Sequence, residues 1–184
     1  SGRAEATGRG VVYALRSFFD CPGDVTKSGL KPGLKGKRII VQGLGNVGYH
    51  AAKILSEEDD ALITHVMERD GAVVDESGIN IETLRSHISS TGSVLGYSGY
   101  VESGLEMLES DADIIIPAAM ELVITEANAK NIKAPLIIEA ANGPVSAKAD
   151  TILRDRGVII IPDLYTNAGG VTVSYFEWIK NLSR

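Results

Sequence analysis

The sequence lacks several features that mark secreted, disulfide-bonded and membrane proteins. Cys21 is the single cysteine among 184 residues, which excludes an internal disulfide and is compatible with a reducing compartment. No apolar stretch approaches the ~18 residues that a membrane-spanning helix needs. The opening residues, SGRAEATGRG, contain no apolar segment of the signal-peptide type. We therefore expect a soluble protein with no membrane partner.

Clustered positive charge and paired metal ligands are also absent from the sequence. The 18 Lys and Arg residues are outnumbered by 24 Asp and Glu residues, which gives a net charge of -6. This balance, without a basic patch, argues against binding to nucleic acid or to an anionic membrane surface. The histidines are scattered without the spacing of metal ligands, and the acidic run 57–60 is typical of a solvated loop. We expect no metal site.

What the sequence does contain is an alternation of apolar, strand-length runs with amphipathic helical segments. The runs are rich in Ile and Val and nearly uninterrupted by polar residues, as expected for parallel strands buried on both faces. The predicted strands are 38–42, 61–67, 112–117, 135–140 and 158–162, and the predicted helices between them are 47–56, 81–89, 125–131 and 147–154. The pattern predicts one α/β domain over residues 1–184, with a doubly wound, mostly parallel sheet and right-handed crossovers.

Two further helices are predicted to flank this sheet, near residues 4–19 and 170–181. Between the first of them and the sheet, residues 21–37 contain two prolines and four glycines. Because these residues interrupt regular structure, we expect the connection to be a loop.

A glycine-rich loop is the strongest local indication of function. The residues GLGNVG at 43–48 directly follow the first predicted strand and open the next helix, and Glu68 stands at the end of the second strand. Gly43 would allow the tight turn, Gly45 would let the backbone approach a pyrophosphate, and Gly48 would allow close packing of helix on strand. This context, more than the hexapeptide alone, predicts a Rossmann-like dinucleotide site.

Other candidate ligands follow the carboxyl ends of predicted strands, where open α/β sheets bind their ligands. Ala118 and Ala119 follow the third strand, Asn142 the fourth and Asn167 the fifth. An asparagine side chain both donates and accepts hydrogen bonds, as a nicotinamide carboxamide does. Taken singly, Asn142 is better explained by a turn, and Asn167 by a helix cap.

At these residues the chain resembles the glutamate dehydrogenase family, which includes leucine, phenylalanine and valine dehydrogenases, and in particular its C-terminal coenzyme-binding domain. The similar stretches, which cover almost the whole chain, lie at residues 2–11, 41–48, 113–119, 139–144 and 162–181. The residues ERDG at 68–71 are similar to the branch that contains the animal mitochondrial enzymes. The resemblance implies oxidative deamination of L-glutamate to 2-oxoglutarate and ammonia with NAD or NADP, and the reverse amination.

The resemblance also implies a need for groups that these residues do not supply. In the family, the catalytic lysine, the acid/base aspartate and most substrate-binding lysines lie in an N-terminal domain with no counterpart in this sequence. We therefore expect a coenzyme domain that contains no catalytic residue, binds dinucleotide and is inactive without the missing domain. The family further implies a parent homohexamer, located in the bacterial cytoplasm or in the mitochondrial matrix.

Carried over by motif, the resemblance implies roles for individual residues. The cofactor-binding residues would be Thr7 for the nicotinamide carboxamide, Gly43, Gly45, Asn46, Val47 and Gly48 for the pyrophosphate, Glu68 for the adenosine ribose, Arg69 for a 2′-phosphate on that ribose, Ala118 and Ala119 for the adenosine side, and Asn142 and Asn167 for the nicotinamide half. The substrate would be faced by Arg3, Val171 and Ser174, and Ser174 would meet the side-chain carboxylate of glutamate.

Two questions stay open at the level of the sequence. Glu68 would accept a hydrogen bond from a ribose 2′-hydroxyl and repel a 2′-phosphate, whereas Arg69 beside it could accommodate that phosphate. We therefore expect NAD to be preferred, with measurable use of NADP. The chain could also be the coenzyme domain of a leucine, phenylalanine or valine dehydrogenase, against which Ser174 argues, or a stand-alone module that senses NAD and performs no chemistry.

Overall fold

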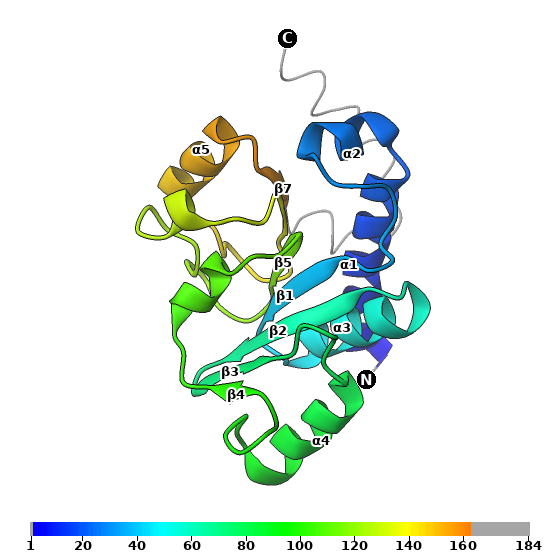
Figure 1. The fold of residues 1–184 in the computed structure, drawn as a ribbon, viewed down its shortest axis with the longest axis vertical. Helices are drawn as coiled ribbons and strands as arrows, with labels where there is room; N and C mark the ends of the chain where they lie inside the picture. The colour runs from blue at the N-terminus through cyan, green and yellow to red at the C-terminus, as the bar shows by residue number, and fades with distance from the viewer. Residues whose placement is uncertain (1, 163–184) are drawn as a thin grey trace.

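The computed structural model describes residues 2–162, and within them a seven-stranded sheet forms the centre of the molecule (Figure 1). The strands run across the sheet in the order β4-β3-β2-β1-β5-β6-β7, so β1 lies between β2 and β5. Their bounds are Arg38–Gln42 (β1), Leu62–Glu68 (β2), Gly71–Val74 (β3), Tyr100–Val101 (β4), Ile114–Pro117 (β5), Leu136–Ile138 (β6) and Ile159–Ile161 (β7).

The five strands predicted from the sequence are all present and all parallel. β1 pairs with β2 on one side and with β5 on the other, and β6 and β7 continue from β5 in the same direction. β5 and β6 are buried along their whole length, because helices or turns cover both faces of the sheet. This burial explains why their sequences show no alternation of polar and apolar residues. The expectation of a Rossmann-like, doubly wound sheet is confirmed.

An antiparallel edge, which the sequence analysis missed, completes the sheet. β3 turns back from β2 through Arg69 and Asp70, so that Glu68 pairs with Gly71, and β4 pairs antiparallel with β3. These strands have only four and two residues. Runs this short carry little periodic signal of their own, and they form because the exposed edge of β2 supplies hydrogen-bond partners.

The principal helices agree with the prediction. They are α1 (Gly2–Phe19), α3 (Asn46–Glu58), α4 (Ile81–Thr91) and α5 (Ala147–Asp155). Asn80 caps α4, because its side chain accepts a hydrogen bond from the Thr83 backbone N–H, and Ser146 caps α5 in the same way through Ala149. The helix predicted near residues 170–181 lies outside the described residues.

The prediction of a loop over residues 21–37 is wrong in part, since a short helix, α2 (Pro22–Ser28), forms there. Pro22 stands in the first turn, where its missing N–H costs nothing. Gly29 ends the helix in the left-handed conformation, with φ of 76°, which glycine adopts without strain. The same prolines and glycines that suggested a loop therefore act as helix start and stop signals.

The helix predicted over residues 125–131 is also wrong, because only a single 3₁₀ turn, η2 (Ala129–Asn131), is present. The buried side chain of Asn128 accepts a hydrogen bond from the Thr125 N–H at 2.9 Å and donates one to the Val123 carbonyl at 2.9 Å. These bonds hold the segment in a turn in place of a helix. A second 3₁₀ turn, η1 (Leu105–Glu109), precedes β5.

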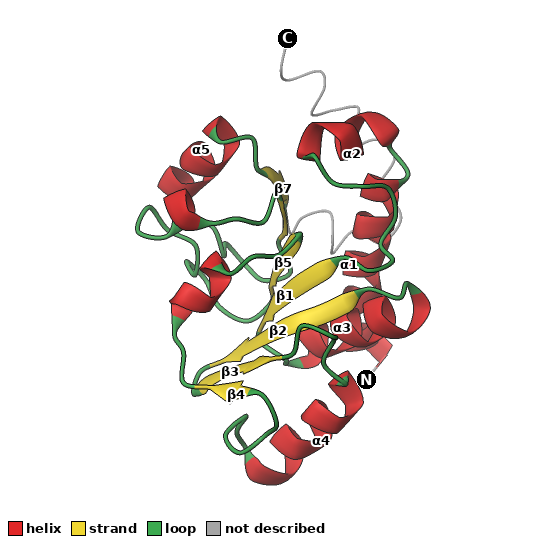
Figure 2. Ribbon diagram, in the orientation of Figure 1, coloured by secondary structure: helices red, strands yellow, loops and turns green. Residues whose placement is uncertain are grey.

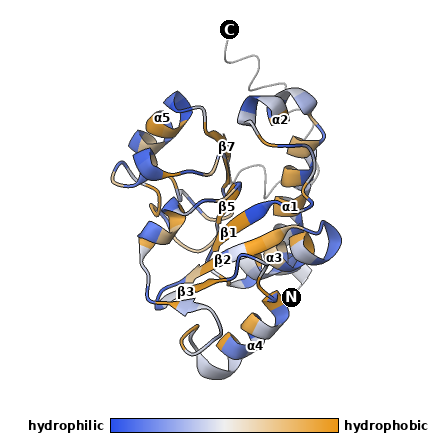
Figure 3. Ribbon diagram, viewed as in Figure 1, coloured by the Kyte–Doolittle hydropathy of each residue, from blue (hydrophilic) through white to orange (hydrophobic). Residues whose placement is uncertain are grey.

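Two apolar layers cover the two faces of the sheet. Ile39 and Val41 of β1 pack into a layer with residues of α1, α2, α3 and α4, whereas Ile40 packs into a second layer with residues of α5, η1 and η2. Figure 2 shows these helices on opposite sides of the strands. In Figure 3 apolar residues run along the strands, and α5 alternates between apolar and polar residues, as a helix with one buried face does.

The acidic run 57–60, expected to be a solvated loop, is in part structural. Glu58 is the last residue of α3, and Asp59 follows as its C-cap. The Arg16 guanidinium of α1 binds both carboxylates, with Nη2 at 2.9 Å from Glu58 Oε2 and at 2.9 Å from Asp59 Oδ2. Their charges are therefore partnered across two helices. Among the described helices, none is both long and apolar enough to cross a membrane.

Candidate functional site

The glycine loop joins β1 to α3 at the point where the chain order of the sheet reverses. From β1 the chain goes to β2 on one side, and it later returns to β5 on the other side of β1. The carboxyl ends of β1 and β5 lie next to each other, since Gln42 pairs with Pro117. Such a reversal leaves a crevice outside the strand ends, where open α/β sheets bind ligands.

Each of the three glycines at this turn meets a different spatial requirement. Gly43 has a φ of 88°, and a Cβ there would overlap the Ala119 side chain. A Cβ on Gly48 would overlap the carbonyl oxygen of Gly43, so α3 can approach the loop this closely only without a side chain. Around a Cβ on Gly45, by contrast, no atom of residues 2–162 lies within 4 Å, apart from its own chain neighbours. Within this part of the chain, nothing blocks the approach of a ligand to Gly45.

The N-terminus of α3 faces this open side without a side-chain cap. Gly45 is the N-cap residue, and as a glycine it supplies no side-chain cap to the first turn. The first backbone N–H groups of a helix have no partner within the helix and carry its positive dipole end. An anionic group such as a pyrophosphate fits this position, with Asn46 and Val47 in the first turn.

Glu68 lies beside the loop, at the carboxyl end of β2. Its Oε1 accepts a hydrogen bond from the Leu44 backbone N–H at 2.6 Å. The half-buried carboxylate is therefore oriented by the loop, and no donor within residues 2–162 is bonded to its second oxygen. Glu68 and the glycine loop, separated in the sequence by a whole helix and strand, form one site.

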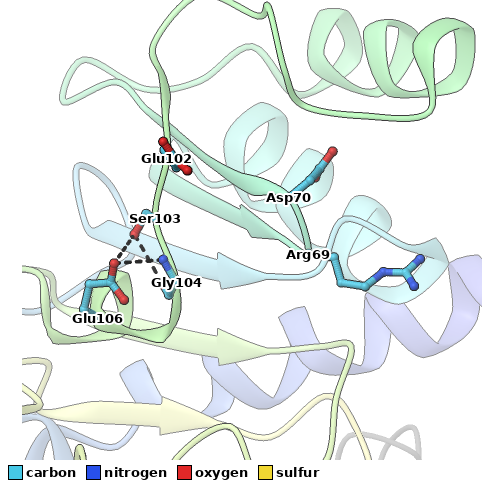
Figure 4. A pocket seen from close by; sticks show the side chains of 6 residues that line it. All are labelled: Arg69, Asp70, Glu102, Ser103, Gly104 and Glu106. Atoms are coloured by element: carbon cyan, nitrogen blue, oxygen red, sulfur yellow. Dashed lines mark hydrogen bonds between the residues drawn. The ribbon is translucent and has the colours of Figure 1, made fainter.

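Two hollows lie on either side of the exposed Arg69. The first, of about 260 Å³, is lined by Glu68, Arg69, Asp70, Ile88, Gly92, Ser93 and Val94. The second, of about 390 Å³, is lined by Arg69, Asp70, Glu102, Ser103, Gly104 and Glu106, and Figure 4 shows Arg69 extending away from Glu106. Glu68 and Arg69 thus line the same hollow. A nucleotide sugar bound to the Glu68 carboxylate would therefore lie close to Arg69.

The Glu106 carboxylate in the larger hollow is fixed by hydrogen bonds from neighbouring residues. Glu106 Oε1 accepts hydrogen bonds from the Gly104 N–H at 2.8 Å and from the Ser103 hydroxyl at 3.3 Å (Figure 4). The Gly104 N–H lowers the pKa of the Glu106 carboxyl, so this group stays ionised at neutral pH. The negative charge makes this hollow a poor place for a phosphate.

Ala118 and Ala119 complete the loop on the β5 side. The Ala119 N–H donates to Gln42 Oε1 at 3.2 Å, and the Ala118 N–H donates to the Gln42 carbonyl at 2.8 Å. Gln42 is buried, and its side chain fixes both the end of β1 and the turn after β5. Gln42 is not among the residues predicted from the sequence, although a polar residue at the end of an apolar strand is a signal for such a role.

Thr7 and Arg3 lie in the first turns of α1, the part of this helix that packs against α3. A Cβ on Gly8 would lie 2.6 Å from His50 Cβ and 3.2 Å from the Val47 carbonyl oxygen, so α1 crosses α3 in close contact at its first turns. The Thr7 hydroxyl, beside Gly8, donates to the Arg3 carbonyl at 3.0 Å and keeps its acceptor capacity. As predicted, Arg3 and Thr7 lie on one face of a helix.

Asn142 is exposed, in the turn after β6, and this turn is tied to the turn after β5. The Leu122 N–H donates to the Gly143 carbonyl at 3.0 Å, and the Ala140 N–H donates to the Pro117 carbonyl at 3.0 Å. Asn142 therefore lies at the same edge of the sheet as the alanines. Asn167, Val171 and Ser174 lie outside the described residues. Among the residues that are described, no group of three or more His, Cys, Asp or Glu side chains is placed to hold a metal ion.

Comparison with known proteins gives this site a context. The family model for glutamate/leucine/phenylalanine/valine dehydrogenases matches residues 1–184. The chain belongs to this family. It is 53% identical over 187 residues to a probable glutamate dehydrogenase of Sinorhizobium fredii, covering 100% of the chain and 42% of that protein. It is 50% identical to the mitochondrial glutamate dehydrogenase of Dictyostelium discoideum, and the match covers 99% of the chain and 36% of that protein.

A third relative and two solved structures extend the comparison. The NADP-specific glutamate dehydrogenase A1 of Halobacterium salinarum is 40% identical, covering 100% of the chain and 42% of that protein. The glutamate dehydrogenase of Peptoniphilus asaccharolyticus has a TM-score of 0.70 at 35% identity, covering 100% and 40%. The hetero-hexameric enzyme of Thermus thermophilus has a TM-score of 0.77 at 27% identity, covering 98% and 40%. The chain thus spans less than half the length of these relatives.

Proposed function

We propose that residues 1–184 form the coenzyme-binding domain of an NAD(P)-dependent glutamate dehydrogenase, which converts L-glutamate to 2-oxoglutarate and ammonia. The observation that carries the proposal is the unobstructed position of Gly45 at the uncapped start of α3, beside an oriented Glu68 carboxylate. Relatives named glutamate dehydrogenase, at 53% and 50% identity, support this choice of substrate.

In the proposed site, the residues of this chain bind and orient the coenzyme. The first turn of α3, with Asn46 and Val47, holds the pyrophosphate, and Glu68 accepts a hydrogen bond from the adenosine ribose. Thr7 and Asn142 orient the nicotinamide half, together with Asn167, while Ala118 and Ala119 line the adenosine side. When bound, the dinucleotide supplies hydride transfer at its nicotinamide ring.

Three residues of this chain are proposed to face the substrate. Arg3, on the face of α1 that carries Thr7, faces the substrate, together with Val171 and Ser174. The groups that exchange protons with glutamate belong to a domain beyond these residues, in agreement with the greater length of the relatives. Assembly as a homohexamer, in the bacterial cytoplasm or the mitochondrial matrix, is part of the same proposal.

The coenzyme choice follows from the neighbours of the ribose. The Glu68 carboxylate favours a 2′-hydroxyl, whereas the exposed Arg69 guanidinium tolerates a 2′-phosphate, so we propose that NAD is preferred and NADP is used. A relative named NADP-specific, 40% identical, supports the use of NADP within the family. A leucine, phenylalanine or valine dehydrogenase remains the second candidate, since the matching family model includes those enzymes.

A substitution at Gly45 tests the proposed site directly. Gly45→Val places a side chain where no atom of the described residues, apart from the chain neighbours, lies within 4 Å, and where φ is -72°, so the described fold should tolerate it. The same side chain occupies the space that a phosphate needs, and we expect NADH binding, measured by calorimetric titration, to be lost while the melting temperature stays close to wild type.

Gly48→Val is the matched control, because its Cβ would overlap the Gly43 carbonyl and should lower the melting temperature instead. Unchanged NADH binding by a folded Gly45→Val protein would contradict the proposed site, and failure of the wild-type chain to bind either dinucleotide would contradict the proposed function.

A further inference from the structure

Leu44, between the first two glycines of the loop, is held from both ends by ionised side chains. Its N–H donates to Glu68 Oε1 at 2.6 Å, and its carbonyl oxygen accepts a hydrogen bond from Arg85 Nη1. Glu68 ends β2, whereas Arg85 belongs to α4, 41 residues away from Leu44 in the sequence. Hydrogen bonds to charged groups are roughly twice as strong as bonds between neutral groups.

The Arg85 guanidinium is itself fixed by the start of α3. Its carbon lies 4.8 Å from the centre of the Tyr49 ring, and its Nη2 lies 3.4 Å from Asn46 Oδ1. Tyr49 in turn donates its hydroxyl to Glu82, which is on α4 with Arg85. The planar guanidinium therefore stacks on one residue of α3 and points its donors at the loop.

The loop needs such an external hold. Gly45 has no side chain, and within residues 2–162 no atom beyond its chain neighbours lies within 4 Å of its Cβ position, so packing of these residues does not fix the backbone there. Leu44, by contrast, is buried, with 2% of its surface exposed. The two bonds at Leu44 fix the direction of the peptide groups on either side of it, and with them the N–H groups that follow.

We propose that Arg85 is a positioning residue for dinucleotide binding, which, opposite Glu68, holds the Leu44 peptide so that the N–H groups at the start of α3 face the pyrophosphate. The inference rests on the proposed function. Arg85 acts through the loop and need not touch the ligand. Because the loop is set before binding, less conformational freedom is lost when the phosphate arrives.

Substitution of Arg85 in the 184-residue chain tests this role. Arg85→Gln removes the charged donor, and we expect the Kd for NADH to rise about tenfold, the scale for loss of one hydrogen bond to a charged group. Arg85→Lys keeps a charged donor for the Leu44 carbonyl but lacks the planar guanidinium, which presents several donors at once. This variant should give an intermediate Kd. Arg154→Gln is the matched control, since it makes the same charge change at an exposed pair on α5 and should leave the Kd unchanged.

Amide hydrogen exchange in the ligand-free proteins separates positioning from general destabilisation. Arg85→Gln should accelerate exchange at residues 44–47 and leave exchange along β1 as in wild type. Acceleration throughout the sheet, wild-type NADH affinity in Arg85→Gln, or an equal loss of affinity in Arg154→Gln would each overturn the inference.

If Arg85→Gln does not fold, the same two measurements on Arg85→Lys decide the question by the same criteria. Wild-type binding of NADH with no effect of the Arg85 substitutions would leave the proposed function intact and remove only this inference. Absence of binding by the wild-type chain would remove the proposed function itself.

Discussion

At the scale of single residues, Glu68 has two tasks that different substitutions can separate. Glu68→Gln keeps an acceptor for the Leu44 N–H but removes the charge that repels a 2′-phosphate. We expect the Kd for NADP, divided by the Kd for NAD, to fall about tenfold, because the loss of one hydrogen bond to a charged group has an effect of this size. Glu68→Ala should weaken the binding of both coenzymes, because the loop also loses the hydrogen bond between the Leu44 N–H and Glu68.

Calorimetric titration of both coenzymes against the three proteins measures these effects. Tighter binding of NADP than of NAD by the wild-type chain would show that Glu68 is not the dominant determinant, and Arg69 would then be the first residue to substitute.

At the scale of elements, α1 and α3 form a pair whose charges complement each other. The C-terminal end of α3 has no basic residue in its last turn and bears Glu58 and Asp59, which the negative end of the helix dipole disfavours. Arg16 of α1 supplies the missing positive charge, with Nε at 3.0 Å from Asp59 Oδ1 and Nη2 at 2.9 Å from Oδ2. The two-point geometry fixes where α1 crosses α3.

We expect Arg16→Gln to lower the free energy of unfolding by about 1–2 kcal/mol, more than an exposed pair, because the Asp59 side chain is 15% exposed. Arg154→Gln, whose pair with Asp150 is 47% and 39% exposed, should cost less than about 0.5 kcal/mol. Urea unfolding measures both. Equal effects of the two substitutions would show that the pairing between helices adds nothing to stability.

The same pairing predicts a dependence on pH. Hydrogen bonds from Arg16 and Arg9 hold the pKa of the Glu58 carboxyl below its ordinary value of 4.5. A carboxyl whose pKa is lowered in the folded state contributes stability that is complete above 4.5 and is lost as the pH falls through the folded value. The stability difference between wild type and Arg16→Gln should therefore shrink below pH 4.5.

At the scale of the whole molecule, the proposed function assigns coenzyme binding to this chain and the proton-transferring groups of the reaction to another domain. The carboxyl edge of the sheet gathers the glycine loop, Glu68 and the alanines after β5, whereas the relatives are more than twice as long as the part that matches. We expect the purified 184-residue chain to bind NADH without oxidising glutamate, measured as the growth of NADH absorbance. A robust rate of glutamate oxidation would contradict the assignment of catalytic groups to another domain.

The sequence by itself determined the five parallel strands, the main helices and the glycine loop, because their signals are local. Unbroken Ile and Val runs, such as IIIP in β5, and a glycine pattern between strand and helix need no distant partner to be recognised. Helix α2 and the Asn128 turn were local too, but their proline, glycine and asparagine were consistent with more than one backbone conformation.

Only the tertiary structure decided which side chains hold the loop. Arg85 meets Leu44 across 41 residues, and Gln42 meets Ala119 across 77. Such contacts depend on strand register and on the angle at which helices cross, which the packing of the whole core sets. The antiparallel edge strands likewise formed on β2 from sequences too short to predict. The sequence therefore specified the glycine-rich motif. The fold specified the side chains that support it, because these become its neighbours only when the sheet and its helices assemble.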